Sequence, residues 1–379
     1  MPNPLYYLLL SLAPPAGGGP PTGAPSEFSI VYMSAADHES SGGHKFPVVG
    51  TSSIDSGITG AHGKVYRTTT SQAFFDLSAS YQDIACRMRI RPTATPGSDL
   101  VIIFRDSTNT NQVAFRLLGG DGSFSVVRAT STTIAGPSAT GLWTLDNWYT
   151  IELKAHIADS PNGSVEASMY NDAGTLLATI SASGIDSQNT ANPSVSRIGV
   201  GGINCDPYFD NVSVDSTGDT LGPCQVETLM PNGAGDLAAH TRGGADSGSN
   251  WSQCEETPDD ADTSYVQSTG ADQDDCYAFA NRSLSGTPRA VQVTAIAKLT
   301  GGASRQIKLF CRIGGVTYLG SITHTLTSSF RGWWEVWNNN PATGNAWTDS
   351  EINSAQFGVR SLTTDCRITQ LAVEVLVDP

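Results

Sequence analysis

Charge is scarce in this sequence, and positive charge is scarcest. Asp, Glu, Lys and Arg make up 15% of the 379 residues, whereas about a quarter is usual in globular proteins. The net charge is −15. Nucleic acids and anionic membranes are bound mainly through Lys and Arg, so we expect neither a nucleic acid nor a membrane as partner.

The motifs of common reaction centres are also missing. The sequence has no CxxC pair, no HExxH and no Gly-x-Ser-x-Gly between a strand and a helix, so neither zinc nor a hydrolase nucleophile is indicated. Its Gly clusters lack a following helix and Lys, which argues against a phosphate site. We therefore expect no enzymatic activity and no cofactor, apart from the calcium candidates weighed below.

Long helical segments are absent as well, and short strand-like runs take their place. Gly (39) and Pro (20) are plentiful, and no long stretch repeats with a period of 3.6 residues. Residues 148–158 alternate apolar and polar side chains, which predicts a half-buried strand. Residues 114–129 and 164–182 each contain two strand-like runs around a Gly-containing turn, the pattern of a β-hairpin.

The spacing of these runs predicts the architecture. Strand-like runs recur about every ten residues without alternating helices, which indicates an all-β fold. We expect an extended N-terminal arm followed by two antiparallel β-sandwich (jelly-roll) domains in tandem. The arm, the first sandwich, a polar linker and the second sandwich are placed at residues 1–25, 26–215, 216–225 and 226–379. Thr348 and Glu351 have the spacing of a capping box, so we expect a short helix there.

The arm contains a short apolar run. The run is too short to span a membrane, and it resembles the centre of a secretory signal, but no Lys or Arg precedes it. The alternative is a docking peptide on a Pro/Gly-rich tether, which would bury its apolar side chains on a partner. We expect the docking peptide, with the contacting residues Leu5, Tyr6, Tyr7, Leu8, Leu9, Leu10 and Leu12.

The first sandwich contains, in order, the stretches "DNWYTIELKAHI", "GSVEASMYNDAGTLLATI", "SRIGVGG" and "DPYFDNVSV". Together these stretches resemble the concanavalin A-like, laminin-G-type jelly roll. It implies a two-sheet sandwich, often carbohydrate-binding and sometimes purely structural. Glycosidases of this family carry Glu-x-Asp-x-x-Glu or Glu-x-Asp-x-Glu on one strand, and neither motif occurs here.

The second sandwich contains the stretches "WSQCEETPDDADTSYV", "AVQVTAIAKLTGGASRQIKLFCRIGGVTYLGS" and "WWEVWNNNPATGNAWTDSEINSAQFGV". These stretches resemble a module of tailed-bacteriophage virion proteins. The resemblance implies a non-enzymatic virion component, either capsid-exterior decoration or fibre, or a tail protein. Its partners would be other virion proteins, and since virions repeat, we expect a homo-oligomer. The expected location is the surface of the virion.

Two acidic clusters are candidates for calcium, which binds six to eight converging oxygens. Both clusters have an alternative, because Asp side chains also cap turns by accepting hydrogen bonds from nearby backbone N–H groups. On this second interpretation, Tyr265 and Val266 follow the first cluster into the core. The first cluster holds Asp259, Asp260, Asp262, Asp272, Asp274 and Asp275, and the second holds Asp206, Asp210 and Asp215.

Seven cysteines leave the redox state open. Spacing alone does not assign disulfides, but Cys254–Cys276 and Cys311–Cys366 are candidate pairs within the second sandwich. The odd count leaves at least one thiol free or paired between chains. The alternative is a set of buried free thiols.

Three tryptophans of one strand are candidates for glycan binding or for an interface. Alternation places Trp333 and Trp337 on one face and Trp334 on the other, so at least one indole is available for a sugar or a subunit. A glycan-binding adhesin, with a host-surface glycan as partner, is therefore the first alternative function. A polysaccharide hydrolase is a remote second, because it needs two carboxylates facing each other across a cleft.

Overall fold

The structure, a computed structural model, is almost entirely β, as the composition predicted. It describes residues 30–34, 52–55, 58, 65–69, 72–245, 248–257, 259–302 and 304–378. Over these residues it contains 26 strands, the helix α1 (Asp349–Ser354) and the 3₁₀ turn η1 (Trp251–Gln253). All strand pairings are antiparallel, which confirms the predicted fold class.

The first fourteen strands form two sheets, called A and B. Sheet A has the order β12 (Leu176–Ile185), β11 (Gly163–Asn171), β10 (Tyr149–His156), β5 (Asp83–Arg91), β14 (Tyr208–Asp215), β3 (Val65–Thr68) and β2 (Ser52–Asp55), with β1 (Ile30–Ser34) paired to β14. Sheet B has the order β4 (Ala73–Tyr81), β13 (Val195–Val200), β6 (Ser98–Arg105), β7 (Asn111–Leu118), β8 (Ser123–Arg128) and β9 (Thr132–Ala135).

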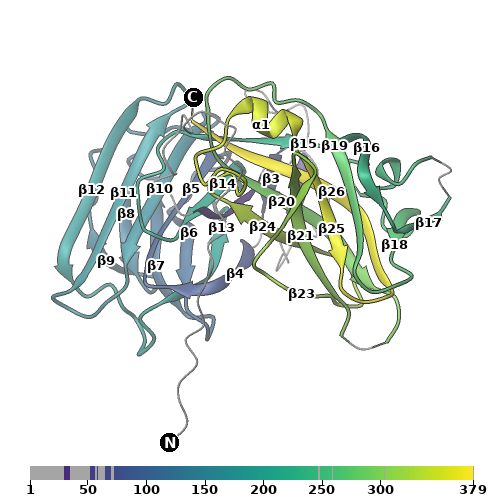
Figure 1. Ribbon diagram of the computed structural model, residues 1–379. Helices are drawn as coiled ribbons and strands as arrows, with labels where there is room; N and C mark the ends of the chain where they lie inside the picture. Colours follow the sequence, from purple (N-terminus) through teal and green to yellow (C-terminus); the bar gives the residue numbers. More distant parts are fainter. Residues whose placement is uncertain are drawn as a thin grey trace, which may run out of the picture.

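The remaining strands form sheets C and D. Sheet C has the order β17 (Thr241–Gly244), β18 (Ser264–Gln267), β26 (Cys366–Asp378), β20 (Thr287–Leu299) and β24 (Arg331–Trp337), with β15 (Gln225–Leu229) paired to β26. Sheet D has the order β16 (Pro231–Ala238), β19 (Gln273–Phe279), β25 (Gln356–Ser361), β21 (Gln306–Ile313) and β22 (Val316–Leu319), with β23 (His324–Thr325) paired to β21. Sheets A and B, in purple to teal, lie beside sheets C and D, in green to yellow (Figure 1).

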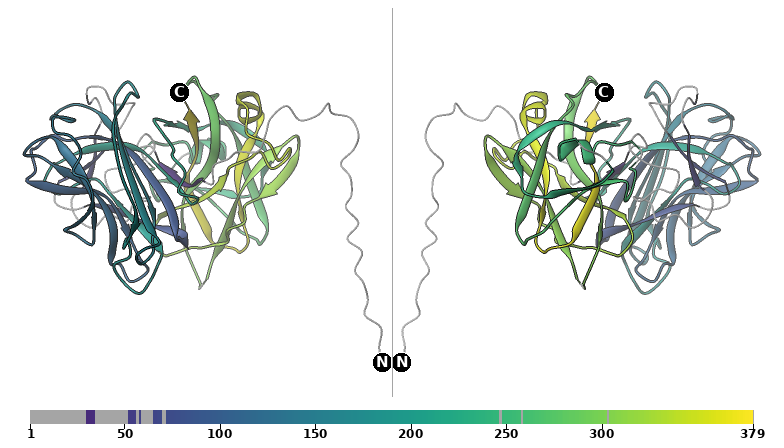
Figure 2. Two further views of the ribbon diagram at one scale, coloured as in Figure 1. Left: turned by 90° about the vertical axis from the view of Figure 1, so that its left-hand side faces the viewer. Right: turned by 90° about the vertical axis from the view of Figure 1, so that its right-hand side faces the viewer.

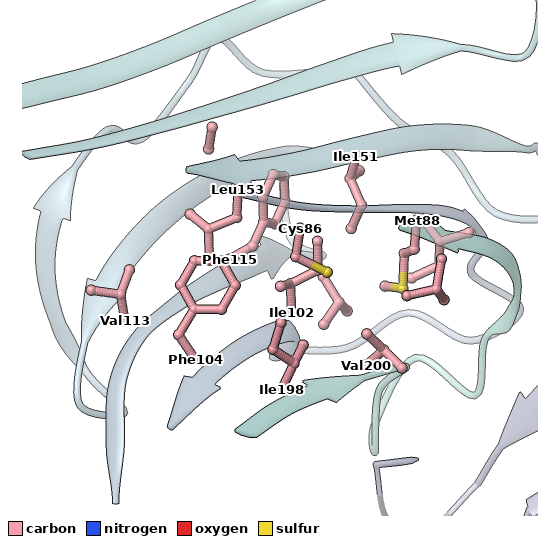
Figure 3. Packing of buried hydrophobic residues seen from close by; sticks show 14 of the residues in the cluster. Cys86, Met88, Ile102, Phe104, Val113, Phe115, Ile151, Leu153, Ile198 and Val200 are labelled. Carbon is pink, nitrogen blue, oxygen red and sulfur yellow. The ribbon is translucent and has the colours of Figure 1, made fainter. Parts of the chain in front are cut away.

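The inner faces of sheets A and B enclose one apolar core. Successive side chains of a strand point to opposite faces, so Ile151, Leu153 and Ala155 of β10 enter the core together. Phe104 and Phe115 meet them from sheet B (Figure 3). These five residues are 0–5% exposed, which accounts for the strong strand pattern of the sequence here.

The linker makes β10 more buried than its alternation predicts. Glu152 points away from the core, yet it is 1% exposed, because the segment after β14 crosses the outer face of sheet A. Its carboxylate accepts hydrogen bonds from the backbone N–H groups of Leu221 (2.5 Å) and Gly222 (3.3 Å). Burial raises the pKa of Glu152, and these two N–H groups oppose that rise. The strand is thus half-buried only near its end, at Lys154 and His156.

The two pairs of sheets meet at β1, through side chains that imitate a strand. The side-chain amide of Gln292 accepts from the backbone N–H of Met33 (3.0 Å) and donates to its carbonyl (2.8 Å). Asn338 does the same for Ile30, at 2.7 and 3.1 Å. Both amides come from the second half of the chain, so β1 is held by β14 on one side and by these amides on the other. Figure 2 shows the two halves in contact from both ends.

The predicted capping box is present at α1. Thr348 accepts from the backbone N–H of Glu351, and the Glu351 carboxylate accepts from the backbone N–H of Thr348 (2.9 Å). Ile352 and Ala355 are buried, as expected for residues that face a sheet. The capping-box prediction is confirmed.

Candidate functional site

The outer face of sheet A carries a polar groove where the linker leaves it open. The groove has a volume of about 470 Å³ and runs across β10, β11 and β12. Most of its side chains are charged or carry a hydroxyl. The lining residues are Asp83, Lys154, Ala155, His156, Ser164, Val165, Glu166, Ser181, Ala182, Ser183, Thr217 and Gly218.

Strand register produces this concentration of polar groups. His156 lies directly opposite Ser164 on β11 and opposite Asp83 on β5. Lys154 lies opposite Glu166 in the same way. Directly opposed residues of antiparallel strands have their Cβ atoms about 5 Å apart, so the side chains form two adjacent polar rows.

A hydrogen bond and an ion pair order the groove while leaving it accessible. Nδ1 of His156 lies 2.7 Å from Oδ1 of Asp83, which fixes the orientation of the ring. Nζ of Lys154 lies 3.5 Å from Oε1 of Glu166 and donates to Oγ1 of Thr220 at 3.0 Å. These four side chains remain 25–51% exposed. The groove therefore presents oriented hydrogen-bond donors and acceptors to a polar ligand.

A second, more apolar cleft lies between β4 and β24, the end strands of sheets B and C. Its volume is about 260 Å³. Aromatic and aliphatic side chains form most of its wall. The lining residues are Phe75, Asp76, Leu77, Ser78, Ile322, His324, Arg331, Gly332, Trp333 and Trp334.

The three candidate tryptophans divide as the alternation predicts. Trp333 and Trp337 pack against the core of the second half, and Trp334 packs against that of the first. The ring of Trp334 meets Tyr32 edge-on, with 5.0 Å between centroids. Trp333 and Trp334 line the cleft between β4 and β24, whereas Trp337 does not. The structure thus brings two of the three predicted residues to one cavity.

Three aspartates of the first acidic cluster cap a strand or form ion pairs. The Asp260 carboxylate accepts from the backbone N–H (3.1 Å) and hydroxyl (3.0 Å) of Ser264, at the start of β18. Asp262 pairs with Lys298 and Arg367. Asp274 pairs with Arg360, and Asp275 is fully buried. Burial raises the pKa of Asp275 to about 6.

The aspartates of the second acidic cluster do not converge on one point. The second cluster is dispersed, because Asp206 forms a bidentate pair with Arg67 at 3.1 and 2.7 Å, while Asp210 and Asp215 lie within β14. No group of three or more His, Cys, Asp or Glu in the described part of the chain is arranged to hold a metal ion. Val266 enters the core as expected, but Tyr265 stays half-buried under the guanidinium of Arg367.

The two predicted disulfides are not formed. All seven cysteines are free and buried. Sγ of Cys254 lies 3.7 Å from the hydroxyl of Tyr277, and Sγ of Cys276 lies 3.1 Å from Oε1 of Gln356. Cys311 belongs to sheet D and Cys366 to sheet C, where its thiol approaches the carbonyl of Thr363 at 3.4 Å. The alternative of buried free thiols is the one found, and burial raises the pKa of Cys254, Cys276 and Cys311.

The predicted docking residues of the arm lie outside the described residues. These are Leu5, Tyr6, Tyr7, Leu8, Leu9, Leu10 and Leu12. Among the residues that are described, no helix has the length and apolar character needed to cross a bilayer.

The sequence alone did not predict the residues that line the groove. Lys154 and His156 were placed on the polar face of a strand, where they looked like ordinary surface residues. Their partners lie on neighbouring strands, Asp83 on β5 and Glu166 on β11. The only available signal was the polar face of residues 148–158, and it needed strand register to become a site.

Comparisons with known proteins concern the fold. No family model matches the chain, and no curated protein does. Among solved structures, a PL-14 alginate lyase from Aplysia kurodai matches with a TM-score of 0.38 and 11% identity, over 49% of this chain and 98% of the lyase. A Bacillus subtilis protein of unknown function with a galectin-like fold matches at 0.34 and 13%, over 51% and 98%.

A further match corrects one expectation. An endo-β-1,4-glucuronan lyase from Trichoderma reesei matches with a TM-score of 0.31 and 11% identity, over 52% of this chain and 94% of the lyase. The sequence led us to expect no enzymatic activity, and that expectation does not stand, because polysaccharide lyases are among the similar structures. The missing motifs were those of hydrolases and zinc enzymes, and a sandwich fold can hold other chemistry.

Proposed function

We propose that this chain is a saccharide-binding β-sandwich protein, and that the polar groove of sheet A is its binding site. The observation that carries the proposal is the pair of polar rows, Lys154–Glu166 and Asp83–His156–Ser164, lining an open groove of about 470 Å³. A saccharide chain offers many hydroxyls, each of which donates and accepts. The groove offers matching groups of both kinds in fixed positions.

The shape of the groove favours a chain over a single sugar. It spans three neighbouring strands, which lie about 4.8 Å apart, so its width accommodates more than one sugar ring. The hydroxyls of Ser181 and Ser183 extend the polar lining onto β12, the end strand of sheet A. A polymer could therefore continue past the edge of the sheet on that side.

A binding assay with soluble polysaccharides tests the proposal. We expect at least one neutral or uronate-containing polymer to retard the protein in affinity electrophoresis. The double variant Lys154→Ala/His156→Ala should lose about 2 kcal/mol or more of binding, since each removes a hydrogen-bonding group at the ligand. Both side chains are partly exposed, so the fold should tolerate the change.

A matched control and a turnover assay complete that experiment. The variant Arg312→Ala removes an exposed ion pair to Asp236 on sheet D and should bind like the wild type. The same mixtures are assayed for new reducing ends and for unsaturated sugars, which reports whether the groove cleaves what it binds. Retention of every polymer by the double variant as by the wild type would refute the groove as the site.

We further propose that the protein acts on the surface of a tailed-phage virion. This proposal is supported by the resemblance of residues 226–379 to a virion module, carried by "PDDADTSYV" and "PATGNAWT". Mass spectrometry of purified particles tests it. Deletion of residues 1–25 should then reduce incorporation into particles, and undiminished incorporation would remove the role of the arm.

A further inference from the structure

Sheet A ends in a strand whose outer edge is open. β12 pairs only with β11, and no other described residue bonds to its backbone N–H or C=O groups. None of its ten residues is buried, and Leu176 at its start is 52% exposed. Figure 1 shows β12 at the outer end of sheet A, on the side away from sheets C and D. An edge of this kind can pair with a strand of another molecule.

The composition of β12 distinguishes it from the other end strands of the four sheets. Natural end strands are often short or carry a charge or a proline, and these features prevent pairing between molecules. β2, β9, β17 and β22 have four residues each. β16 begins with Pro231, β4 contains Asp76 and β24 contains Glu335. β12 has ten residues and neither a proline nor a charge, so it is the end strand without such protection.

We infer that a second copy of this protein pairs with β12, strand against strand and antiparallel, so that two copies of sheet A become one continuous sheet. An antiparallel pair of identical strands is self-complementary, because the twofold axis repeats each contact. Two ten-residue strands form about ten hydrogen bonds in such a pair, close to the number in a typical protein–protein interface. Two copies with a net charge of −15 repel each other, and a strand without charge opposes their approach least.

Strand geometry restricts how the two copies of β12 align. Directly opposed residues lie on the same face of a sheet, so the twofold axis passes through a residue and not between two residues. An axis at Ser181 brings the hydroxyl of Thr179 opposite that of Ser183 on the outer face. On the inner face, where both side chains pack against the core, Ile180 then lies opposite Ala182. This axis therefore matches hydroxyl with hydroxyl and apolar with apolar side chains.

This alignment joins the polar grooves of the two copies, a consequence that rests on the proposed function. Lys154, Glu166 and Ser181 lie directly opposite one another on β10, β11 and β12. With the axis at Ser181, this row continues into the same row of the second copy. Six neighbouring strands then form one surface about 24 Å across, at about 4.8 Å between strands. The ligand is a polysaccharide chain long enough to contact both copies, and each copy extends the binding surface of the other.

Light scattering after size-exclusion chromatography tests the pairing. We expect the wild type at micromolar concentration to have about twice the chain mass of 39.8 kDa. Leu176→Glu/Thr179→Glu places acidic side chains along the edge and should raise the dissociation constant of the dimer about a hundredfold or more. Both side chains are exposed and neither lines the groove, so the variant should keep its fold and its groove. Circular dichroism verifies that the variant is folded.

A matched control and a cross-link complete that experiment. Val316 and Leu319 of the end strand β22 are 54% and 40% exposed, so Val316→Glu/Leu319→Glu adds the same two charges elsewhere and should dimerise like the wild type. Ser181→Cys tests the pairing without disrupting it. At the axis the two residues are directly opposed, with Cα atoms about 5 Å apart, so a mild oxidant should cross-link the copies. The seven native cysteines are buried, and the wild type should stay uncross-linked.

Polymer binding separates this inference from the proposed function. A long polysaccharide that contacts both grooves should bind Leu176→Glu/Thr179→Glu about tenfold or more weakly than the wild type, whereas a short oligosaccharide should bind both proteins alike. If no saccharide binds, the proposed function fails, and the mass still decides the pairing. The inference is overturned by a monomeric wild type, by a folded β12 variant that keeps the mass of the wild type, or by a Ser181→Cys variant that does not cross-link.

Discussion

At the scale of single residues, His324 makes stability depend on pH. Its pKa lies near 4 in the folded protein, against 6.5 ordinarily, because the ring is buried. Burial thus disfavours protonation of the ring in the folded state. The contribution of the neutral ring to the free energy of unfolding is fully present above pH 6.5 and is lost as the pH falls toward 4. Between pH 7 and pH 5 we expect His324 to remove about 2 kcal/mol from the free energy of unfolding.

Urea unfolding of the wild type and of His324→Gln at both pH values measures this contribution. The variant should lose about 2 kcal/mol less than the wild type over the same interval. His240 acts in the same direction, since burial lowers its pKa to about 4 as well, so part of the loss persists in the variant. Equal losses in the two proteins would show that His324 does not titrate in this way.

At the scale of elements, the amide of Gln292 holds β1. Besides Met33, it donates to the carboxylate of Glu374 at 2.6 Å, so the whole group is buried and bonded. Gln292→Met conserves volume but leaves the N–H and C=O of Met33 unpaired, and we expect a cost of about 2–4 kcal/mol. Hydrogen exchange should accelerate at Met33 while β5 stays protected. Unchanged exchange at Met33 would mean that the amide is dispensable.

The same elements show what sequence can predict. The strand at β10 and the cap at α1 depend on neighbours within a few residues, so alternation and the Thr348–Glu351 spacing were sufficient. Burial of Glu152 depends on Leu221, which lies 69 residues further along the chain. The side-chain amide of Gln292 bonds to Met33 across a separation of 259 residues. The groove likewise needs the register of β10 with β5 and β11. Such contacts follow from strand order, which local patterns do not encode.

At the scale of the whole molecule, a small apolar cluster joins the two pairs of sheets. It contains Ile30 and Met33 of β1, Leu221 and Cys224 of the linker, and Val226, Ala290 and Leu376 of sheet C. Leu221 is 1% exposed, so Leu221→Asp buries a charge there and should cost at least about 3 kcal/mol. We expect one calorimetric transition in the wild type and two in the variant. A single transition in both would mean that the halves do not depend on this cluster.

The side-chain amides that hold β1 also affect whether this strand can pair with a strand of another molecule. An end strand with open N–H and C=O groups recruits strands from other molecules, and crowded β proteins fuse through such edges. Gln292 and Asn338 occupy those groups at Met33 and Ile30, and a side chain, unlike a strand, offers nothing further to pair with. At this border, therefore, Ile30 and Met33 offer no free backbone N–H or C=O group to a strand of another molecule.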